Sequence, residues 1–250
     1  MHLISAGKLK KAASKYSDVA TTIKAFCKTI EQAQWQSLID VQHIYRDAEA
    51  VGNFTVFNIK GNKYRLILDI DYEEQVAYFK YFLTHAEYDK RCDPASAKDA
   101  RERAPRRGNG KMTFTINRED YFRLLQETQL VPKVIETETE YEQNLAVAEK
   151  LIAKKKNRSP EETTLLRLLV KLIEDYEETN YHLKEWQDLP PHEILQHLLE
   201  VSHIKQADLV GIISPSKGLI SAIVNGKRAI SKEQAKKLGE YFKISSSLFI

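Results

Sequence analysis

Residues 54–70, with the sequence FTVFNIKGNKYRLILDI, decide the fold of the first part of the chain. Apolar and polar side chains alternate from Phe54 onward, and strands are predicted at 55–59 and 64–70, because a period of two is typical of half-buried β-strands. Between them, Gly61-Asn62 suits the central positions of a type II′ turn, since glycine adopts a positive φ without strain. A third strand is predicted at 76–83. The stretch therefore predicts a small antiparallel sheet.

Two helices are predicted before this hairpin, after a short apolar start to the chain. Ser5 is a candidate N-cap for a helix that ends near Lys15, and Asp18 is a candidate N-cap for one that ends near Ala33. The predicted order of elements is β-α-α-β-β-β, over about 90 residues, which is long enough for one modest core. Residues 1–92 are therefore assigned to one α+β domain.

The rest of the 250-residue chain is predicted to be helical, after a linker. Residues 93–111 contain almost no large apolar side chain, so they cannot bury enough surface to become ordered, and they are assigned as a flexible linker. A capping box at 159–162 precedes a leucine-rich stretch. A Pro-Pro pair then separates a helical region, 112–190, from a C-terminal domain, 191–250. The predicted fold class is an α+β domain followed by an all-α part.

The C-terminal domain has the pattern of a helix-turn-helix. Four short helices are predicted, at 192–202, 206–213, 217–225 and 232–242. This spacing resembles the XRE/Cro-type helix-turn-helix, in which the second helix of the motif enters the major groove of DNA. Lys217 and Ser221 are the candidate readers of base edges, and phosphate contacts are expected from flanking polar and basic residues. The candidate DNA-binding residues are Gln206, Ser216, Lys217, Ser221, Asn225, Lys227 and Arg228.

Cationic side chains gather around the predicted hairpin, and a histidine and a tyrosine follow the last strand. These residues are Lys60, Lys63, Arg65, His85 and Tyr88. Cleavage of RNA by its own 2′-hydroxyl needs a base at that hydroxyl, positive charge at the phosphate oxygens and an acid at the leaving oxygen, and these residue types supply all three without a metal. The same residues are also common in polar turns and at domain ends, so a structural role stays open.

The strings VFNIKGNKYRL at 56–66 and THAEYD at 84–89 resemble the HigB branch of the RelE-like toxins. The resemblance extends over residues 1–91 and implies a ribosome-dependent mRNA endonuclease built as a small sheet with two helices. It implies that Arg65 stabilises the phosphate and that Lys60 and Lys63 lie around the scissile phosphate. His85 and Tyr88 lie where the C-terminal catalytic pair of the family is expected, and which of them is the base and which the acid is left open.

Residues 112–250 resemble the HigA antitoxins, the partners of HigB toxins, from Pro132-Lys133-Val134-Ile135 through the helix-turn-helix. Because 112–190 carries a net charge of −5, we expect this region to bind the basic toxin. The chain is interpreted as a toxin–antitoxin unit whose antitoxin part neutralises the toxin, in cis or across a homodimer, and binds operator DNA to repress its own operon. The alternative is a DNA-binding autorepressor whose toxin part is catalytically dead and only structural.

The remaining features exclude other classes of protein. No run approaches the roughly 18 apolar residues of a transmembrane helix, and the start of the chain has no apolar leader segment. Cys27 and Cys92 are too few for a disulfide framework or a four-ligand zinc site, and the histidines lack metal-ligand spacing. The basic run at 154–158 is interpreted as an ordinary helix C-terminus. We therefore expect a cytoplasmic protein without a metal, a cofactor or a membrane contact.

Overall fold

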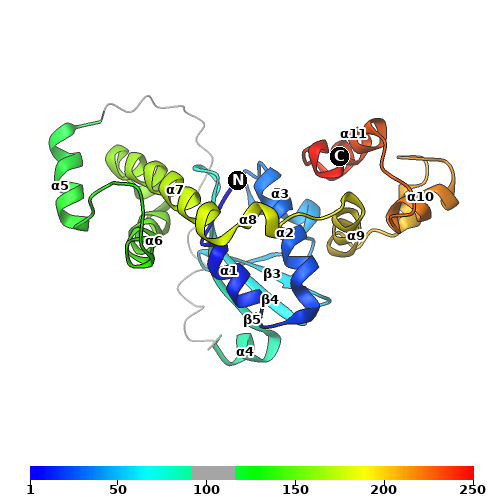
Figure 1. Cartoon of the computed structure of the whole chain (residues 1–250), viewed down its shortest axis with the longest axis horizontal. Helices are drawn as coiled ribbons and strands as arrows, with labels where there is room; N and C mark the ends of the chain where they lie inside the picture. The colour runs from blue at the N-terminus through cyan, green and yellow to red at the C-terminus, as the bar shows by residue number, and fades with distance from the viewer. Residues whose placement is uncertain (92–115) are drawn as a thin grey trace.

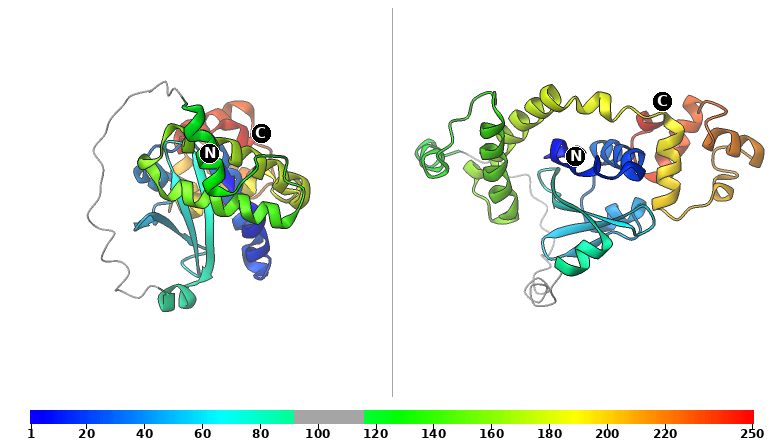
Figure 2. Two further views of the ribbon diagram at one scale, coloured as in Figure 1. Left: turned by 90° about the vertical axis from the view of Figure 1, so that its left-hand side faces the viewer. Right: turned by 60° about the horizontal axis from the view of Figure 1, so that its bottom comes forward.

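The computed structural model of the chain describes residues 1–91 and 116–250 (Figure 1). Along the chain these residues form a sheet region at 1–91, a group of helices at 118–186 and a C-terminal helical group at 191–249. In Figures 1 and 2 the two helical groups flank the sheet region on opposite sides. The linker predicted at 93–111 lies outside the described residues.

The sheet has five strands in the order β1-β5-β4-β3-β2. They are β1 (His2–Ile4), β2 (Glu49–Val51), β3 (Phe54–Ile59), β4 (Tyr64–Asp71) and β5 (Val76–Thr84). The three predicted strands of the hairpin region are confirmed as antiparallel neighbours. The prediction of a wholly antiparallel sheet is wrong, because β1 pairs parallel with β5 after a connection that passes through helices.

The β3–β4 turn differs from the predicted type II′ turn. Gly61 and Asn62 both have a positive φ, 58° and 74°, and the Lys63 N–H donates to the Lys60 carbonyl over 3.2 Å. Positive φ at both central positions defines a type I′ turn, and asparagine tolerates this conformation better than most residues. Lys60 has a positive φ as well, 55°, so the turn begins with a third left-handed residue.

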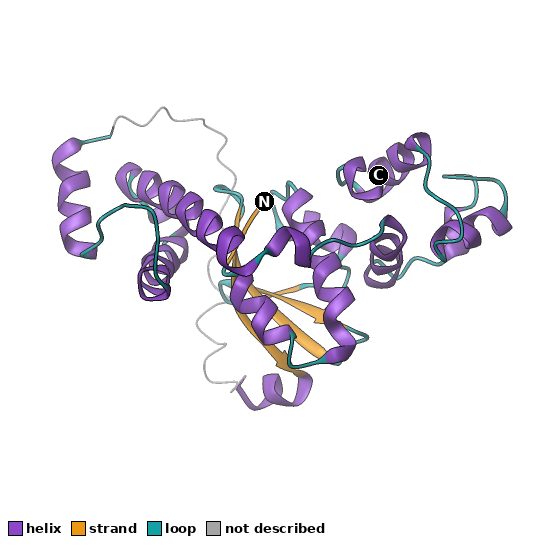
Figure 3. Ribbon diagram, viewed as in Figure 1, coloured by secondary structure: helices purple, strands orange, loops and turns teal. Residues whose placement is uncertain are grey.

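Helices cover one face of the sheet (Figure 3). In this region they are α1 (Ala6–Ala13), α2 (Ala20–Gln32), α3 (Leu38–Ile44) and α4 (His85–Arg91). The first two confirm the prediction, whereas α3, α4 and β2 were not predicted. Neither predicted cap forms: the side chain of Ser5 makes no capping hydrogen bond, and Asp18 lies in a 3₁₀ turn, Ser17–Val19. Phe26 of α2 packs edge-on against Phe57 of β3 at the centre of the core, with ring centroids 5.0 Å apart.

The next group of helices packs against the other face of the sheet, over β1, β5 and part of β4. It contains α5 (Arg118–Thr128), α6 (Glu138–Ala153), a 3₁₀ turn (Lys155–Asn157), α7 (Pro160–Tyr181) and α8 (Leu183–Trp186). The predicted capping box is confirmed, since Ser159 and Glu162 bond each other's backbone N–H groups. Ile4, Val76 and Tyr78 of the sheet share one apolar cluster with α5, α6 and α7.

The C-terminal group contains α9 (Pro191–Val201), η4 (Gln206–Leu209), α10 (Lys217–Val224), α11 (Lys232–Phe242) and η5 (Ser246–Phe249). The helix predicted at 206–213 is wrong: only the four-residue 3₁₀ turn η4 forms. Gly211 has a φ of 87° and Pro215 follows closely, and both features oppose continuation of a helix. The first helix of the predicted helix-turn-helix is therefore reduced to one turn.

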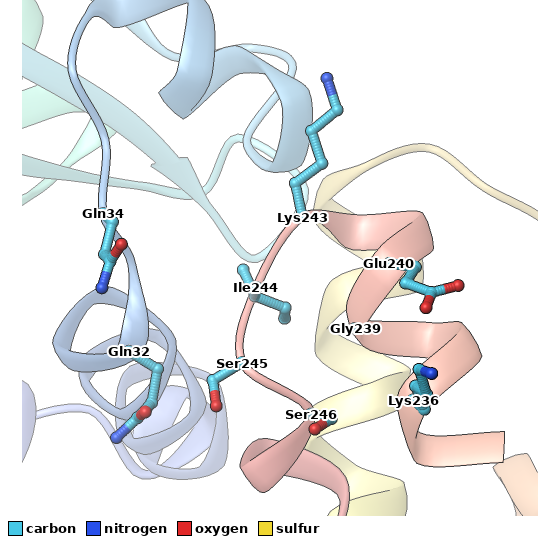
Figure 4. Close-up of a pocket in the computed structure, with 9 residues that line it drawn as sticks. All are labelled: Gln32, Gln34, Lys236, Gly239, Glu240, Lys243, Ile244, Ser245 and Ser246. Carbon is cyan, nitrogen blue, oxygen red and sulfur yellow. The ribbon is translucent and has the colours of Figure 1, made fainter. Parts of the chain in front are cut away.

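The C-terminal group and the sheet region share one hydrophobic core. Phe26 and Ile30 of α2 belong to the same buried cluster as Leu195 and Leu198 of α9 and Phe249 of η5. Polar contacts at this boundary include Tyr45 Oη with His197 Nε2 at 3.1 Å. A pocket of about 430 Å³ opens elsewhere at this boundary, where residues 243–246 run between the end of α2 and α11 (Figure 4). Its lining is mixed and includes two lysines, one glutamate and two glutamines.

Candidate functional site

The predicted catalytic residues lie at one end of β4 and β5, where α4 begins. Arg65 of β4 is opposite Asn58 of β3 and Leu83 of β5, and Tyr64 is opposite Thr84. The N–H of His85 donates to the Lys63 carbonyl over 3.0 Å, which brings the start of α4 to the turn. In Figures 1 and 2, α4 lies apart from both helical groups.

Helix α4 begins at His85 because the preceding residue, Thr84, caps its N-terminus. Glu87 accepts hydrogen bonds from the N–H and the hydroxyl of Thr84, at 2.8 and 2.9 Å. This exchange between a threonine and a glutamate three residues later is typical of a helix N-terminus. His85 Nδ1 then lies 2.7 Å from Asp89 Oδ2, one turn along the same helix. Asp89, which was not among the predicted site residues, holds Nδ1 and leaves Nε2 of His85 available for proton transfer.

Arg65 lies on the sheet and is largely buried, with only 7% of its area exposed. Its Nη1 donates to the Asn62 carbonyl over 3.2 Å, and its Cζ lies 5.5 Å from the centre of the Tyr88 ring. An arginine against an aromatic face keeps its charge while its orientation is fixed. The structure therefore brings Arg65 and Tyr88 together.

Lys63 forms an ion pair with Asp18, a residue that sequence reasoning assigned to a helix cap. Lys63 Nζ lies 2.6 Å from Asp18 Oδ2, and the Tyr64 hydroxyl donates to Asp18 Oδ1 over 2.9 Å. The Lys63 ammonium lowers the pKa of Asp18, and Asp18 raises the pKa of Lys63. Asp18 thus anchors the turn to the start of α2 and sets the position of the lysine.

Lys60 lies at the other end of the same turn, in a second pocket. This pocket has a volume of about 460 Å³ and contains Asn58 and Lys60 on one side and Glu200 and His203, at the end of α9, on the other. His203 Nε2 is 2.7 Å from Asp47 Oδ2, which fixes that wall. Lys60 therefore borders the C-terminal group.

The contact between the sheet region and residues 118–181 uses ion pairs of both polarities. The expectation that an acidic middle binds a basic sheet region therefore describes only half of the contact. Acidic residues of the helices pair with basic groups of the sheet region, and basic residues of the helices pair with acids of the sheet region. The pairs are Glu142–Lys8, Glu149–Lys80 and Glu174–His2 in the first sense, and Lys155–Asp69, Arg158–Asp71 and Arg167–Glu74 in the second.

Two of these cations come from the basic run at 154–158, which the sequence suggested was an ordinary helix end. Arg158 and Asp71 are almost fully buried, with side chains 3% and 4% exposed, and Nη1 lies 2.5 Å from Oδ2. Lys155 pairs with Asp69 and donates to the Ile70 carbonyl over 2.8 Å. The signal that could have found them is the pair of aspartates at alternate positions of a strand that is otherwise buried.

The predicted DNA-binding residues lie around α10. Ser216 caps this helix, accepting from the Leu219 N–H over 3.3 Å, as predicted. The Asn225 amide donates to the Ser221 carbonyl over 2.7 Å, so these two side chains lie together at its end. Ser221 is half-buried, and the other predicted residues are exposed. The exposed ones are Gln206, Ser216, Lys217, Asn225, Lys227 and Arg228.

Among residues 1–91 and 116–250, no group of three or more His, Cys, Asp or Glu side chains is arranged to hold a metal ion. Over the same ranges, no helix combines the length and the apolar character needed to cross a bilayer.

Comparison with known proteins places the N-terminal region. A family model described as HigB_toxin, the RelE-like toxic component of a toxin-antitoxin system, matches residues 19–91. The chain is 32% identical over 95 residues to the mRNA interferase toxin HigB of Escherichia coli K12, a match that covers 36% of this chain and 88% of that protein. The mRNA interferases HigB of Escherichia coli O157:H7 and Shigella flexneri match to the same extent. Through its N-terminal region, the chain belongs to the HigB toxin family.

Proposed function

We propose that residues 1–92 form an endoribonuclease domain that cleaves mRNA on the ribosome and that the rest of the chain restrains it. The observation that carries the enzymatic part is the cluster of Arg65, Tyr88 and His85 at the start of α4, in a region that is 32% identical to an mRNA interferase. The fixed positions and the positive charge of this cluster suit an RNA phosphate, and the proposed activity needs no metal.

The chemistry follows from the positions of these side chains. Arg65, oriented by Tyr88 and the Asn62 carbonyl, stabilises the negative charge that develops on the phosphate oxygens. His85, held at Nδ1 by Asp89, transfers a proton at Nε2 to or from a sugar oxygen. Lys63 adds positive charge at the turn. Tyr88 is the second candidate for proton transfer, so the assignment of base and acid between His85 and Tyr88 stays open.

Restraint in the intact chain is supported by two contacts. The end of α9, in the C-terminal group, supplies Glu200 and His203 to the pocket that contains Lys60, and so restricts access to this lysine. Buried ion pairs, including Arg158–Asp71, hold residues 118–181 against the sheet region of the same chain. We therefore favour neutralisation in cis by an antitoxin-like part, residues 112–190, connected through 93–111. The comparisons with known proteins concern the toxin region, so this part of the proposal depends on contacts alone.

The C-terminal domain, 191–250, is proposed to bind operator DNA and to repress the operon that encodes the chain. Support comes from the exposed basic residues beside α10 and from the Ser216 cap, which leaves the first turn of this helix at the surface. Binding to a palindromic operator would require a homodimer. Such a protein acts in the cytoplasm.

A second function is favoured by one observation. Arg65 is only 7% exposed and Lys63 is already paired with Asp18, as in a purely structural site. On this alternative the chain is a DNA-binding autorepressor with a catalytically dead toxin domain.

Cleavage of mRNA in a translating extract distinguishes the two functions. The proteins compared are the intact chain, a chain with Arg158→Ala and Arg167→Ala at the contact, and the same variant with Arg65→Ala added. We expect little cleavage by the first, clear cleavage by the second and a loss of about 100-fold or more in the third. Residues 1–92 alone, tested for folding by circular dichroism, provide the check: a folded but inactive fragment would support the repressor alternative.

A further inference from the structure

Helix α7 lies along the first turn of α1 and the edge strand β1, and three of its residues meet them from one side. Glu174, Glu177 and Tyr181 are spaced by three and four residues, which places them on one face of the helix. Glu174 Oε1 lies 2.5 Å from His2 Nδ1, and the Tyr181 carbonyl accepts a hydrogen bond from Lys10 Nζ over 2.7 Å. Both ends of this part of the helix therefore make polar contacts with the sheet region.

Glu177, at the centre of this face, is 1% exposed and is bound by one donor of the sheet region and one donor of α6. Its Oε1 accepts from the Gly7 N–H over 3.0 Å and from the Tyr141 hydroxyl over 2.6 Å. The nearby N–H groups of Ser5 and Ala6 act against the effect of burial on the pKa of this carboxyl group, but among the described residues Oε2 has no hydrogen-bond partner. Ser5 has a φ of 65°, and a left-handed residue before a helix turns successive N–H groups toward one point. The first turn of α1 thus offers a backbone N–H donor, that of Gly7, to the carboxyl group of Glu177.

A second feature of the same turn is its shape. A Cβ atom on Gly7 would overlap the ring of Tyr181, because the ring lies directly against the glycine. The ring also packs edge-on against Tyr141 and Tyr176, with centroids 6.0 and 6.3 Å away, so it has little freedom to move aside. Gly7 is therefore needed for the ring to reach the turn, independently of the hydrogen bonds.

We propose that residues 5–7 form the recognition site by which the sheet region selects helix α7, and that this site accepts a carboxyl group and an aromatic ring placed four residues apart on one helix. The occupant is the chain's own Glu177–Tyr181 pair, and the kind of partner that fits is an acidic helix with this spacing. The inference relies on the proposed function only for the consequence that docking restrains the toxin. Stability and hydrogen exchange report the docking itself, so its failure is distinguishable from a lack of ribonuclease activity.

The shape requirement is tested with Gly7→Ala, with Gly218→Ala of α10 as the matched control. Both substitutions replace a helical glycine by a better helix former, and a Cβ on Gly218 meets open space apart from Ser216 Oγ at 3.9 Å. We expect Gly218→Ala to leave the melting temperature unchanged or raised. Gly7→Ala should lower it and increase amide exchange through residues 174–181 at least tenfold. When Tyr181 is already alanine, Gly7→Ala should have no further effect.

Two results would overturn the shape requirement. One is wild-type exchange of α7 in the Gly7→Ala chain. The other is an equal effect of Gly7→Ala whether residue 181 is tyrosine or alanine.

The carboxyl requirement is tested with Glu177→Ala, with the neighbouring Glu178→Ala as control. Glu178 makes only a surface ion pair with Lys184 at 3.5 Å. Acetate is the probe, because it can refill the space left by the carboxyl group. We expect acetate to raise the melting temperature of Glu177→Ala by several degrees more than chloride does at equal ionic strength, and to have no such effect on Glu178→Ala. Equal shifts in both variants would contradict the site.

Glu177→Gln supplies a milder variant. Its amide NH₂ would take the place of Oε2, which is buried and has no hydrogen-bond partner among the described residues, so two buried donors would be left unpaired and exchange of α7 should still increase. Wild-type protection in Glu177→Gln would show that the turn does not distinguish a carboxyl group from an amide.

Discussion

Replacing Arg158 by methionine should destabilise the whole chain more than any substitution of a surface charge. Arg158 and Asp71 are 3% and 4% exposed, and their charged atoms are 2.5 Å apart. Methionine keeps much of the volume of the arginine stem but removes its charge. The Asp71 carboxylate would then be left buried, with only the N–H groups of Glu73 and Glu74, each 3.1 Å from Oδ1, as remaining donors.

The magnitude follows from the cost of leaving one buried charge without its partner, which is about 3–5 kcal/mol. In a chain of this size, 1 kcal/mol corresponds to a change of about 2–4 °C in the melting temperature, so the expected decrease is roughly 6–20 °C. Thermal and urea denaturation followed by circular dichroism measure both quantities. Arg123→Met is the control, because Arg123 pairs with Asp120 at the surface over 3.3 Å and should contribute less than about 1 kcal/mol.

A double variant refines the same test. Asp71→Asn combined with Arg158→Met removes both charges, so most of the lost stability should return. If Arg158→Met alone changes the free energy of unfolding by no more than Arg123→Met does, the reasoning from burial is refuted. A double variant as unstable as the single one would show that packing of the arginine stem, and not its charge, accounts for the loss.

Two further predictions concern pH and DNA. Burial raises the pKa of Glu177 to about 7, so its contribution to stability is present below about pH 4.5 and is lost as the pH rises through 7. Burial lowers the pKa of His197 to about 4, so its contribution is present above about pH 6.5 and is lost as the pH falls toward 4. The two effects on the free energy of unfolding oppose each other, so the stability of the intact chain should depend only weakly on pH between 4.5 and 7. Glu177→Gln should become more stable as the pH rises and His197→Phe less stable, each by about 3 kcal/mol. Urea denaturation across this pH range measures these changes, and parallel curves for all three proteins would contradict the prediction. For DNA binding, the double variant Lys217→Ala with Ser221→Ala should relax the preference for particular bases. Lys227→Ala or Arg228→Ala should instead weaken binding to every sequence and reduce, by about one, the slope of the logarithm of affinity against the logarithm of salt concentration. Binding titrations at several salt concentrations measure both effects, and an unchanged base preference in the double variant would show that α10 does not read bases.

The features that could be predicted from the sequence are those with a local signal. The β3–β4 hairpin follows from alternation over a few residues around Gly61-Asn62, and the start of α7 follows from Ser159 and Glu162, which bond each other within one turn. The type of the turn was wrong because glycine permits both II′ and I′, and the choice depends on Asn62 also adopting a positive φ.

Other features depend on partners far away in the sequence. Asp18 looks like a helix cap until the fold brings Lys63 and Tyr64 to it, 45 and 46 residues later. Lys155 and Arg158 resemble a helix end until they reach Asp69 and Asp71 across the sheet. Periodicity contains no information on such pairs. The prediction of a helix at 206–213 was wrong for a different reason. The apolar pattern there resembles that of the helix-turn-helix family, but Gly211 and Pro215 oppose a helical backbone after the first turn.

The core that the sheet region shares with the C-terminal group has a consequence for synthesis. Phe26 and Ile30 are covered in part by Leu195, Leu198 and Phe249, which a ribosome adds well after the sheet region. At roughly 5–20 residues per second, the segment after residue 91 takes about 10–30 s to translate, and during that interval the newly made N-terminal region lacks these neighbours. During synthesis the apolar residues of α2 are therefore exposed beside the ribosome that is still making the chain. The speed of elongation sets how long that exposure lasts.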